Sequence, residues 1–199
     1  MPVNISKGQT VNLNKAAQES GVTLPSTGLT NVLVGLGWDV ANTTTKDYDL
    51  DLSVYALDKD GKTPRETSYV FYNQRNGEGL ALSADNRTGE GEGDDEFANI
   101  DLKAIPADIQ SIAIIVTLHD AENRGQDLNM MQNAFCRIED TTSKKEIAKF
   151  AITNSGIKGD TLRFGTLNRS SDGWEFVAEG SASTAGGIDV TMRKFGVAA

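Results

Sequence analysis

The feature that most restricts the fold of this chain is an acidic, glycine-spaced segment at residues 85–96, D-N-R-T-G-E-G-E-G-D-D-E. Six of its twelve residues are carboxylates, and glycine occupies every second position in its middle. Neighbouring like charges repel, by roughly 1 kcal/mol per close pair in water and by more at the lower dielectric of a protein surface. The glycines allow positive φ angles and a close approach of the backbone to an ion. The segment therefore predicts a loop that folds around a cation.

A second acidic group, Asp47, Asp49 and Asp51, lies upstream, and the two groups together hold most of the acidity of the chain. The whole chain has a net charge of −9, of which residues 85–96 contribute −5 and the upstream group −3. The acidity is therefore local. We expect no direct binding to nucleic acid, because phosphate backbones need a basic surface. An anionic membrane would be repelled as well, unless calcium bridges the two surfaces.

The ligand types in these segments favour calcium. Calcium accepts six to eight oxygen ligands in flexible geometry, from carboxylates, amides, backbone carbonyls and water. Residues 85–96 offer carboxylates, the neutral oxygens of Asn86 and Thr88, and carbonyls around three glycines. The alternative is a solvated acidic loop without an ion. Regular glycine spacing and a second acidic group nearby favour the ion-binding interpretation.

Short stretches of alternating apolar and polar residues predict an all-β protein, since side chains in a strand repeat every two residues. Many short strands in a chain of this length imply two packed sheets, which we expect to form a single-domain β-sandwich of two mostly antiparallel sheets over residues 1–199. We predict an opening hairpin of residues 3–6 and 10–13, a loop at 14–28 and a short C-terminal helix at 187–195. The other strands are expected at residues 31–40, 48–57, 68–73, 80–83, 97–102, 111–119, 133–139, 146–152, 161–167 and 174–179.

The strand pattern also predicts where the acidic groups lie. Along residues 48–57, the period of two places the upstream aspartates on one face and Leu50, Leu52, Val54 and Ala56 on the other. The D-x-D-x-D start of this segment is not an EF-hand, because the glycine and glutamate that an EF-hand loop needs are missing. The acidic loop is flanked by strands on both sides, so a rigid frame would hold its ligands.

The single histidine and the single cysteine receive structural interpretations. His119 ends the most apolar strand, and we interpret it as a hydrogen-bonded residue at a strand end, with a role in or beside the ion site as the alternative. Cys136 is expected to be a small core residue, and one cysteine excludes an internal disulfide. The sequence has no apolar run long enough to span a membrane and no signal peptide at its N-terminus. The cytoplasm is therefore the expected compartment.

Five motifs follow one another along the chain: V-L-V-G-L-G-W-D (32–39), D-Y-D-L-D (47–51), F-Y-N (71–73), the acidic segment (85–96) and V-T-L-H-D-A (116–121). In this order they closely resemble the TerD family of tellurite-resistance and stress-response proteins. The resemblance extends over essentially the whole chain, as far as the C-terminal F-G-V. It implies a calcium-binding β-sandwich with two ions, located in the cytoplasm or at the inner face of a bacterial membrane. It does not assign the chain to TerD, TerE or TerZ.

Carried over by position, the acidic motifs of the family give a set of candidate metal ligands. Two ions with about seven ligands each, some of them shared, would use most of the set. Glu92 stands where a family member can carry aspartate, so its longer side chain could lie outside the first coordination shell. Asp39 and Asp120 are second choices. The candidate ligands are Asp47, Asp49, Asp51, Asp85, Asn86, Thr88, Glu90, Glu92, Asp94, Asp95 and Glu96.

The sequence favours a non-enzymatic calcium-binding module that acts through partner proteins of the tellurite and stress-resistance system. One alternative is a metal-dependent hydrolase of phosphate or sugar esters, although such sites usually combine histidine with carboxylates. Another is a lectin-like sandwich that presents calcium to sugar hydroxyls. The sequence does not predict the oligomeric state.

Overall fold

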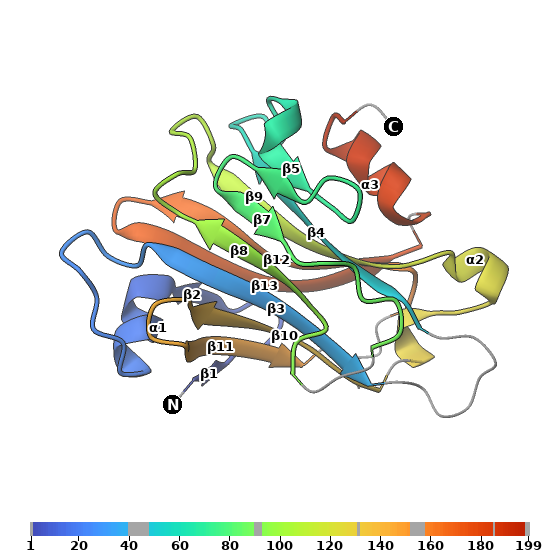
Figure 1. The fold of residues 1–199 in the computed structure, drawn as a ribbon, viewed down its shortest axis with the longest axis horizontal. Helices are drawn as coiled ribbons and strands as arrows, with labels where there is room; N and C mark the ends of the chain where they lie inside the picture. The colour runs from blue at the N-terminus through green and yellow to red at the C-terminus, as the bar shows by residue number, and fades with distance from the viewer. Residues whose placement is uncertain are drawn as a thin grey trace.

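Two β-sheets packed face to face form the body of the molecule (Figure 1), as the alternating pattern predicts. The structure is a computed structural model, and it describes residues 2–39, 48–89, 93–130, 132–151, 158–184 and 186–197. Within these residues every strand pairing is antiparallel except the one between the first strand and the eleventh. The predicted β-sandwich is therefore confirmed.

The first sheet contains seven strands and carries one side of the acidic loop. Its central strand is the glycine-containing strand that the sequence predicts, now bounded at Asn31–Asp39. In spatial order, the strands are β1 (Val3–Asn4), β11 (Lys145–Ala151), β10 (Gln132–Asp140), β3 (Asn31–Asp39), β8 (Glu96–Asp101), β7 (Leu80–Leu82) and β6 (Asn76–Gly77).

The second sheet contains six strands and carries the upstream aspartates. The apolar strand expected at residues 111–119 lies inside this sheet, between two neighbours. In spatial order, the strands are β2 (Thr10–Asn12), β13 (Gly173–Ser183), β12 (Thr161–Ser170), β9 (Ser111–Leu118), β4 (Leu50–Leu57) and β5 (Tyr69–Val70).

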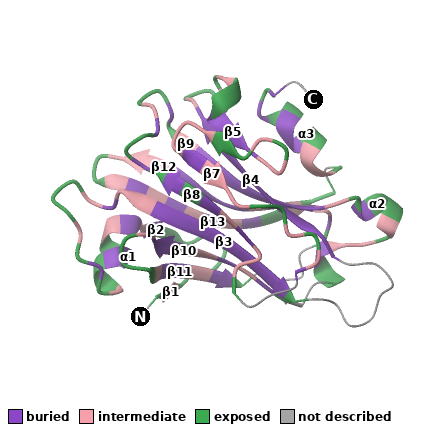
Figure 2. Ribbon diagram, viewed as in Figure 1, coloured by how far each residue is buried: buried purple, intermediate pink, exposed green. Residues whose placement is uncertain are grey.

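The main core fills the space between the sheets (Figure 2), where buried residues follow the strands. The predicted inward face of β4, from Leu50 to Ala56, is buried there, and Cys136 joins it as a small core residue. Trp38 and Trp174 also belong to this core. The outer face of β4 and β9 is buried too, which the core between the sheets does not explain.

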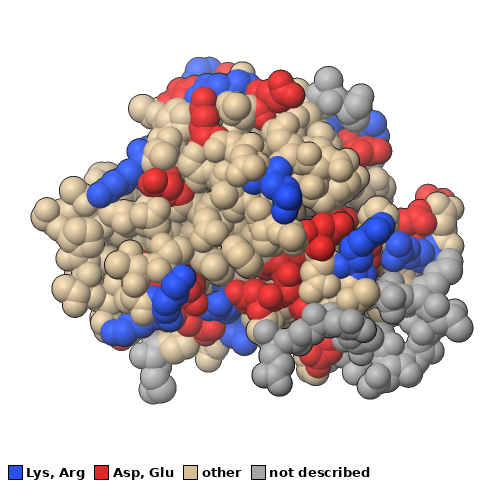
Figure 3. Space-filling view, in the orientation of Figure 1, with Lys and Arg blue, Asp and Glu red and all other residues tan. Residues whose placement is uncertain are grey.

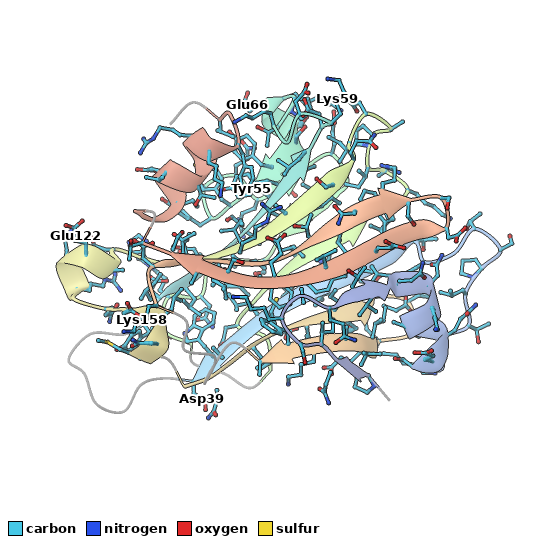
Figure 4. The ribbon with its side chains drawn as sticks, turned by 180° about the vertical axis from the view of Figure 1, so that it is seen from behind. Asp39, Tyr55, Lys59, Glu66, Glu122 and Lys158 are labelled. Atoms are coloured by element: carbon cyan, nitrogen blue, oxygen red, sulfur yellow. The ribbon has the colours of Figure 1, made fainter. Side chains whose placement is uncertain are left out.

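The helix α3 (Gly187–Lys194) covers that outer face and explains its burial. Met192 and Phe195 pack there against Tyr55 and Ile115 in a second, smaller apolar cluster. The rings of Tyr55 and Phe195 lie 4.8 Å apart, and Figure 4 shows Tyr55 beside this helix. The predicted C-terminal helix is thus confirmed. Because it covers their outer face, β4 and β9 are buried on both faces.

The predicted opening hairpin is wrong. Its two halves are strands, but β1 pairs with β11 in one sheet and β2 pairs with β13 in the other. Gly8, with φ +82°, turns the chain between them, and its N–H donates to the carbonyl of Ala178 at 2.7 Å. Alternation predicts that a segment is a strand but says nothing about its partner, so two adjacent strands look like a hairpin.

The predicted loop at residues 14–28 begins as a helix instead, α1 (Leu13–Glu19). The side chain of Asn12 caps it by accepting the Lys15 N–H at 3.0 Å. Leu13, Ala16 and Ala17 are spaced for one helical face, and all three are buried. Seven residues are too few for a strong periodic signal, which is why the pattern was missed.

The predicted strand at residues 68–73 is shorter than expected. It ends after Val70 because Phe71 and Gln74 exchange two backbone hydrogen bonds, at 3.0 and 2.9 Å, and close a tight turn. The short strand β6 follows this turn. Three further helical turns are described: the 3-10 turns η1 (Glu66–Ser68) and η2 (Leu128–Met130), and α2 (Ala121–Arg124). None of the helices in the described segments is long and apolar enough to cross a membrane.

Candidate metal centre

Asp49 and Asp51 are positioned by the start of β4. Asp51 lies opposite Thr117 of β9, and the carbonyl of Asp49 accepts the N–H of His119 at 2.9 Å. Residues two apart in a strand point to the same face, so both carboxylates are on the outer face of the six-stranded sheet. They are almost completely buried there, with 3% and 4% of each residue exposed.

Asp85 brings a third carboxylate from the other sheet. It follows β7, in the loop that leads towards β8. One oxygen atom from each of Asp49, Asp51 and Asp85 lies within 4.8 Å of the other two. We call these three residues the aspartate triad. Within the part of the chain that the structure describes, it is the one group of metal-binding side chains this close together.

Two arginines form long ion pairs with the aspartate triad. The nearest guanidinium nitrogens, on Arg87 and Arg124, are 4.0 and 3.9 Å from Asp49 Oδ2, beyond direct hydrogen-bond distance. Asp49 Oδ1 is buried without a hydrogen-bond partner. Figure 3 shows acidic side chains gathered on this side of the molecule, with basic ones beside them.

Burial shifts the protonation of two members of the triad, Asp49 and Asp51, whereas Asp85 is exposed. Loss of solvation raises the pKa of Asp49, and the charge of His119 acts in the opposite direction. Burial, followed by the charge of Asp49, raises the pKa of Asp51 to about 7. His119 Nδ1 lies 3.4 Å from Asp51 Oδ2 and favours the ionised carboxylate. Ionised groups in this position need a cation, because desolvation and mutual repulsion both oppose their charge.

The donor atoms fit a hard cation. The three carboxylates are oxygen ligands of the kind that calcium and magnesium take. The unpartnered Asp49 Oδ1 is the oxygen atom that such an ion would satisfy, since buried polar atoms in proteins nearly always have a partner. The triad could therefore hold a metal ion.

Glu96 connects the two sheets beside the triad. Its buried carboxylate accepts the N–H of Leu52 in β4 at 2.7 Å and the N–H of Asn86 at 3.2 Å. Burial raises the pKa of Glu96 to about 8, although both N–H donors oppose the shift. Glu96 thus holds the acidic loop against the strand that carries Asp51.

Asn86 and Asp95 fold the loop itself. The Asn86 side-chain oxygen accepts the N–H groups of Thr88 and Gly89, at 3.2 and 3.1 Å, which closes a local turn. The Asn86 side-chain amide donates to Asp95 Oδ1 at 3.0 Å, while Asp95 Oδ2 accepts the backbone N–H of Trp38 at 2.9 Å. Burial raises the pKa of Asp95, and the Trp38 N–H lowers it in part. These side chains order the loop through contacts within the protein.

Asp94 has a different partner. The guanidinium of Arg137 donates to both Asp94 oxygens, at 2.8 and 2.7 Å, and also to Glu139 at 2.7 Å. Gly35 makes room for this contact, since a Cβ atom there would lie 2.3 Å from Asp94 Oδ2. Asp94 therefore fixes the end of the loop to the outer face of the seven-stranded sheet.

The remaining sequence candidates divide as follows. Asp47, Glu90 and Glu92 lie outside the described residues. Asp39 accepts the Asn133 amide at 2.5 Å and lies at the end of β3 (Figure 4). Asp120 precedes α2, accepts the Asn123 amide at 2.6 Å and is close to the triad through its neighbour His119. Metal binding by candidates outside the triad stays a prediction.

Two contributors to the site were not predicted from the sequence. Arg137 is 43 positions from Asp94, and an arginine within a strand does not by itself indicate its partner. The other is Trp38, a core residue whose indole N–H donates to the Tyr48 carbonyl at 3.0 Å. It thereby ties the end of β3 to the segment that carries Asp49.

The fold and the site together define an acidic β-sandwich with a carboxylate cluster, buried at Asp49 and Asp51, that is suited to a hard cation. Residues 1–195 match the model of the TerD domain. The chain therefore belongs to the TerD family, as the motifs at residues 32–39, 47–51 and 85–96 indicated.

Individual relatives agree with this assignment. The tellurium resistance protein TerD of Alcaligenes sp is 38% identical, with 99% of this chain and 98% of the relative covered. General stress protein 16U of Bacillus subtilis is 38% identical, with 94% and 93% covered. A crystal structure of a TerD homologue from Streptomyces coelicolor superposes with a TM-score of 0.64 at 21% identity, over 78% of this chain and 92% of that one, and supports the fold.

Proposed function

We propose that this chain is a non-enzymatic calcium-binding module of the bacterial response to tellurite and other chemical damage, acting through partner proteins. The observation that carries the proposal is the aspartate triad, in which a buried oxygen of Asp49 has no hydrogen-bond partner. The names of the relatives, which include tellurium resistance and general stress proteins, support the physiological context.

Calcium suits the triad better than the softer transition metals. The carboxylates of the triad are hard oxygen donors, and calcium accepts the irregular geometry that three aspartates from two sheets offer. The acidic segments contain more carboxylates than one ion would use, so we propose two ions, as the family resemblance implies. The additional ligands would come from the candidates outside the triad.

A bound ion would join the two sheets at one edge. Asp85 belongs to the loop that connects β7 and β8 of the seven-stranded sheet, whereas Asp49 and Asp51 belong to the six-stranded sheet. Calcium would replace their repulsion with shared coordination and order the loop between β7 and β8. We propose that this ordered surface is what partner proteins of the resistance system recognise, in the cytoplasm or at the inner face of the membrane.

A structural role agrees better with the chemistry of the site than hydrolysis does. The chain contains a single histidine, and His119 contacts Asp51 at the edge of the triad. The neighbouring carboxylates of Asp94, Asp95 and Glu96 are hydrogen-bonded within the protein, which suits a frame for an ion. Failure to hydrolyse a panel of phosphate and sugar esters with calcium or magnesium present is the expected result, and turnover lost in Asp49→Asn would contradict it.

Calorimetric titration with calcium, paired with thermal unfolding, tests the proposal. At a calcium concentration a few hundred times the dissociation constant, binding should stabilise the fold by about 3 to 4 kcal/mol. Asp49→Asn should abolish most of the binding heat, because it removes a triad charge while keeping the side-chain volume. Asp172→Asn, an exposed acid in the turn between β12 and β13, is the matched control. No binding heat together with an unchanged melting temperature would overturn the proposal.

A pull-down from stressed cells tests the partner claim separately. Performed once with calcium and once with chelator, it should recover a set of proteins in the calcium sample alone. The Asp49→Asn variant should lose the same proteins even with calcium present. Equal recovery in all samples would show that partner binding does not depend on the ion.

A further inference from the structure

A hollow of about 320 Å³ lies beside the triad, between the outer face of the six-stranded sheet and the start of α3. Its floor is formed by the ends of β4 and β9, through Asp51 and Thr117. The N-terminal residues of α3 form one wall, and Tyr72 with His119 forms another. The volume is at the small end of the range for ligand pockets. The hollow therefore suits a small molecule.

Acidic side chains line this hollow. Asp51, Asp120 and Asp189 line it, and none of its described lining residues is a lysine or an arginine. The start of a helix carries a partial positive charge, but Asp189 lies in the first turn of α3 and offsets it. Burial, and then the charges of Asp51, Asp189 and Asp85, raise the pKa of Tyr72. Apart from His119, the charged side chains that line the hollow are therefore carboxylates.

A second observation on the floor points to a missing ligand. Thr117 is 1% exposed, and its hydroxyl oxygen is buried without a hydrogen-bond partner. It stands directly across the strand pair from Asp51, so both side chains are on the face that the hollow occupies. A hydroxyl accepts hydrogen bonds as well as donating them. A ligand that donates could bond to Thr117 and Asp51 together.

The wall provides a surface for the apolar part of such a ligand. The rings of Tyr72 and His119 meet edge to face, 6.5 Å apart, and Ile188 adds an aliphatic side chain across from them. A cation near the face of an aromatic ring gains an electrostatic attraction. Carboxylates, a hydroxyl and an aromatic ring are thus combined in one hollow.

We propose that this hollow binds a small organic cation: an ammonium group directed at Asp51 and Thr117, with an apolar body against Tyr72 and Ile188. The inference does not require that the triad binds calcium. If it does, the two ligands share Asp51, and each should weaken the other by the same factor.

The probe for the experiment is 2-phenylethylammonium, with neutral 2-phenylethanol and anionic phenylacetate as matched controls. Nuclear magnetic resonance titration of the metal-free full chain should show shifts at the amides of Thr117 and Ile188 with the ammonium compound alone. Asp189→Asn should weaken its binding about threefold, as for an exposed charge pair, and Tyr72→Leu by about the same factor. Asp172→Asn, in the turn at the opposite end of β12, should leave it unchanged.

Four outcomes would overturn the inference. Equal binding of 2-phenylethanol would show an apolar hollow without preference for charge, and stronger binding of phenylacetate would show an anion site. No shifts at millimolar probe would show that no such site exists. A calcium-saturated sample should bind the ammonium compound at least tenfold more weakly, and unchanged affinity there would show that Asp51 does not hold it. If calcium itself fails to bind, the proposed function fails, while the metal-free titration still tests the hollow.

Discussion

One carboxylate oxygen of Glu96 accepts the backbone N–H of Leu52 at 2.7 Å. A side chain from β8 in one sheet thus provides the hydrogen-bond acceptor for a backbone group of β4 in the other. The short strand β5 pairs with β4 only at Val54 and Tyr55. Glu96 thus takes the place of a neighbouring strand at Leu52. The same carboxylate holds the N–H of Asn86 and with it the start of the acidic loop.

Removing this carboxylate should destabilise the fold. In Glu96→Ala the buried N–H of Leu52 loses its acceptor, which costs about 1 to 3 kcal/mol. Glu96→Gln keeps one acceptor oxygen and should recover part of the loss. Urea denaturation measures both variants, with the exposed Glu122→Ala on α2 as the control, expected within about 0.5 kcal/mol of the parent protein. Equal stability of Glu96→Ala and the control would contradict this role.

The buried acids also predict how stability depends on pH. The pKa of Asp51 is raised from 3.8 to about 7 and that of Glu96 from 4.5 to about 8. In this window the folded state binds more protons than the unfolded state, so the free energy of unfolding of the metal-free protein falls as the pH rises. Calcium should reverse the trend, because it favours the ionised carboxylates. Denaturation with chelator at several pH values measures the slope, and a rise in stability between pH 5 and pH 8 would contradict the assignment.

Asp94 and Asp49 should differ in their effect on calcium affinity. Asp94 is paired with Arg137 through both oxygens, whereas Asp49 belongs to the triad. We expect Asp94→Asn to lower stability but to change the dissociation constant for calcium by less than about threefold, and Asp49→Asn to raise it more than tenfold, a difference of at least about 1.4 kcal/mol for Asp49. Calorimetric titration compares the two. A larger loss of affinity in Asp94→Asn would move the ion towards the end of the loop.

Gly89 and Gly61 form a matched pair for the packing of the loop. Both have positive φ angles, +67° and +70°, so alanine at either position carries a similar backbone penalty of about 1 to 2 kcal/mol. A Cβ atom at Gly61 meets nothing within 4 Å, whereas one at Gly89 would lie 2.3 Å from Trp38 Nε1.

Gly89→Ala should therefore cost more stability than Gly61→Ala, by about 1 kcal/mol or more, and it alone should weaken calcium binding. Thermal and urea unfolding measure the first effect, and calorimetry measures the second. Identical losses in the two variants would mean that the loop does not rest on Trp38.

Local patterns were enough to predict most of the strands. The alternation in β3 and β4 and the apolar run of β9 identified strands whose inward residues are buried, and the spacing of Ile188, Met192 and Phe195 identified α3. The partners of strands could not be predicted, because pairing depends on residues far apart in the chain. For this reason β1 and β2 looked like a hairpin, although they belong to different sheets.

The site shows the same division. Clustered acids predicted a cation site, and the structure brings Asp49, Asp51 and Asp85 together. The sequence could not predict the separate roles of the three consecutive acids at the end of the acidic segment. Asp94 pairs with Arg137. Asp95 accepts the backbone N–H of Trp38, and Glu96 accepts that of Leu52. Each of these partners is distant in the chain. Neighbouring carboxylates that look alike in the sequence therefore have different roles in the structure.

The central claim is that the two acidic segments meet over a metal ion at the aspartate triad. A crystal structure determined with calcium tests it most directly. We predict an ion bound to Asp49, Asp51 and Asp85 with calcium–oxygen distances of about 2.3 to 2.6 Å, and the peak should be absent in Asp49→Asn crystals grown under the same conditions. Water alone among these three carboxylates at saturating calcium, or carboxylates that point apart, would contradict the account.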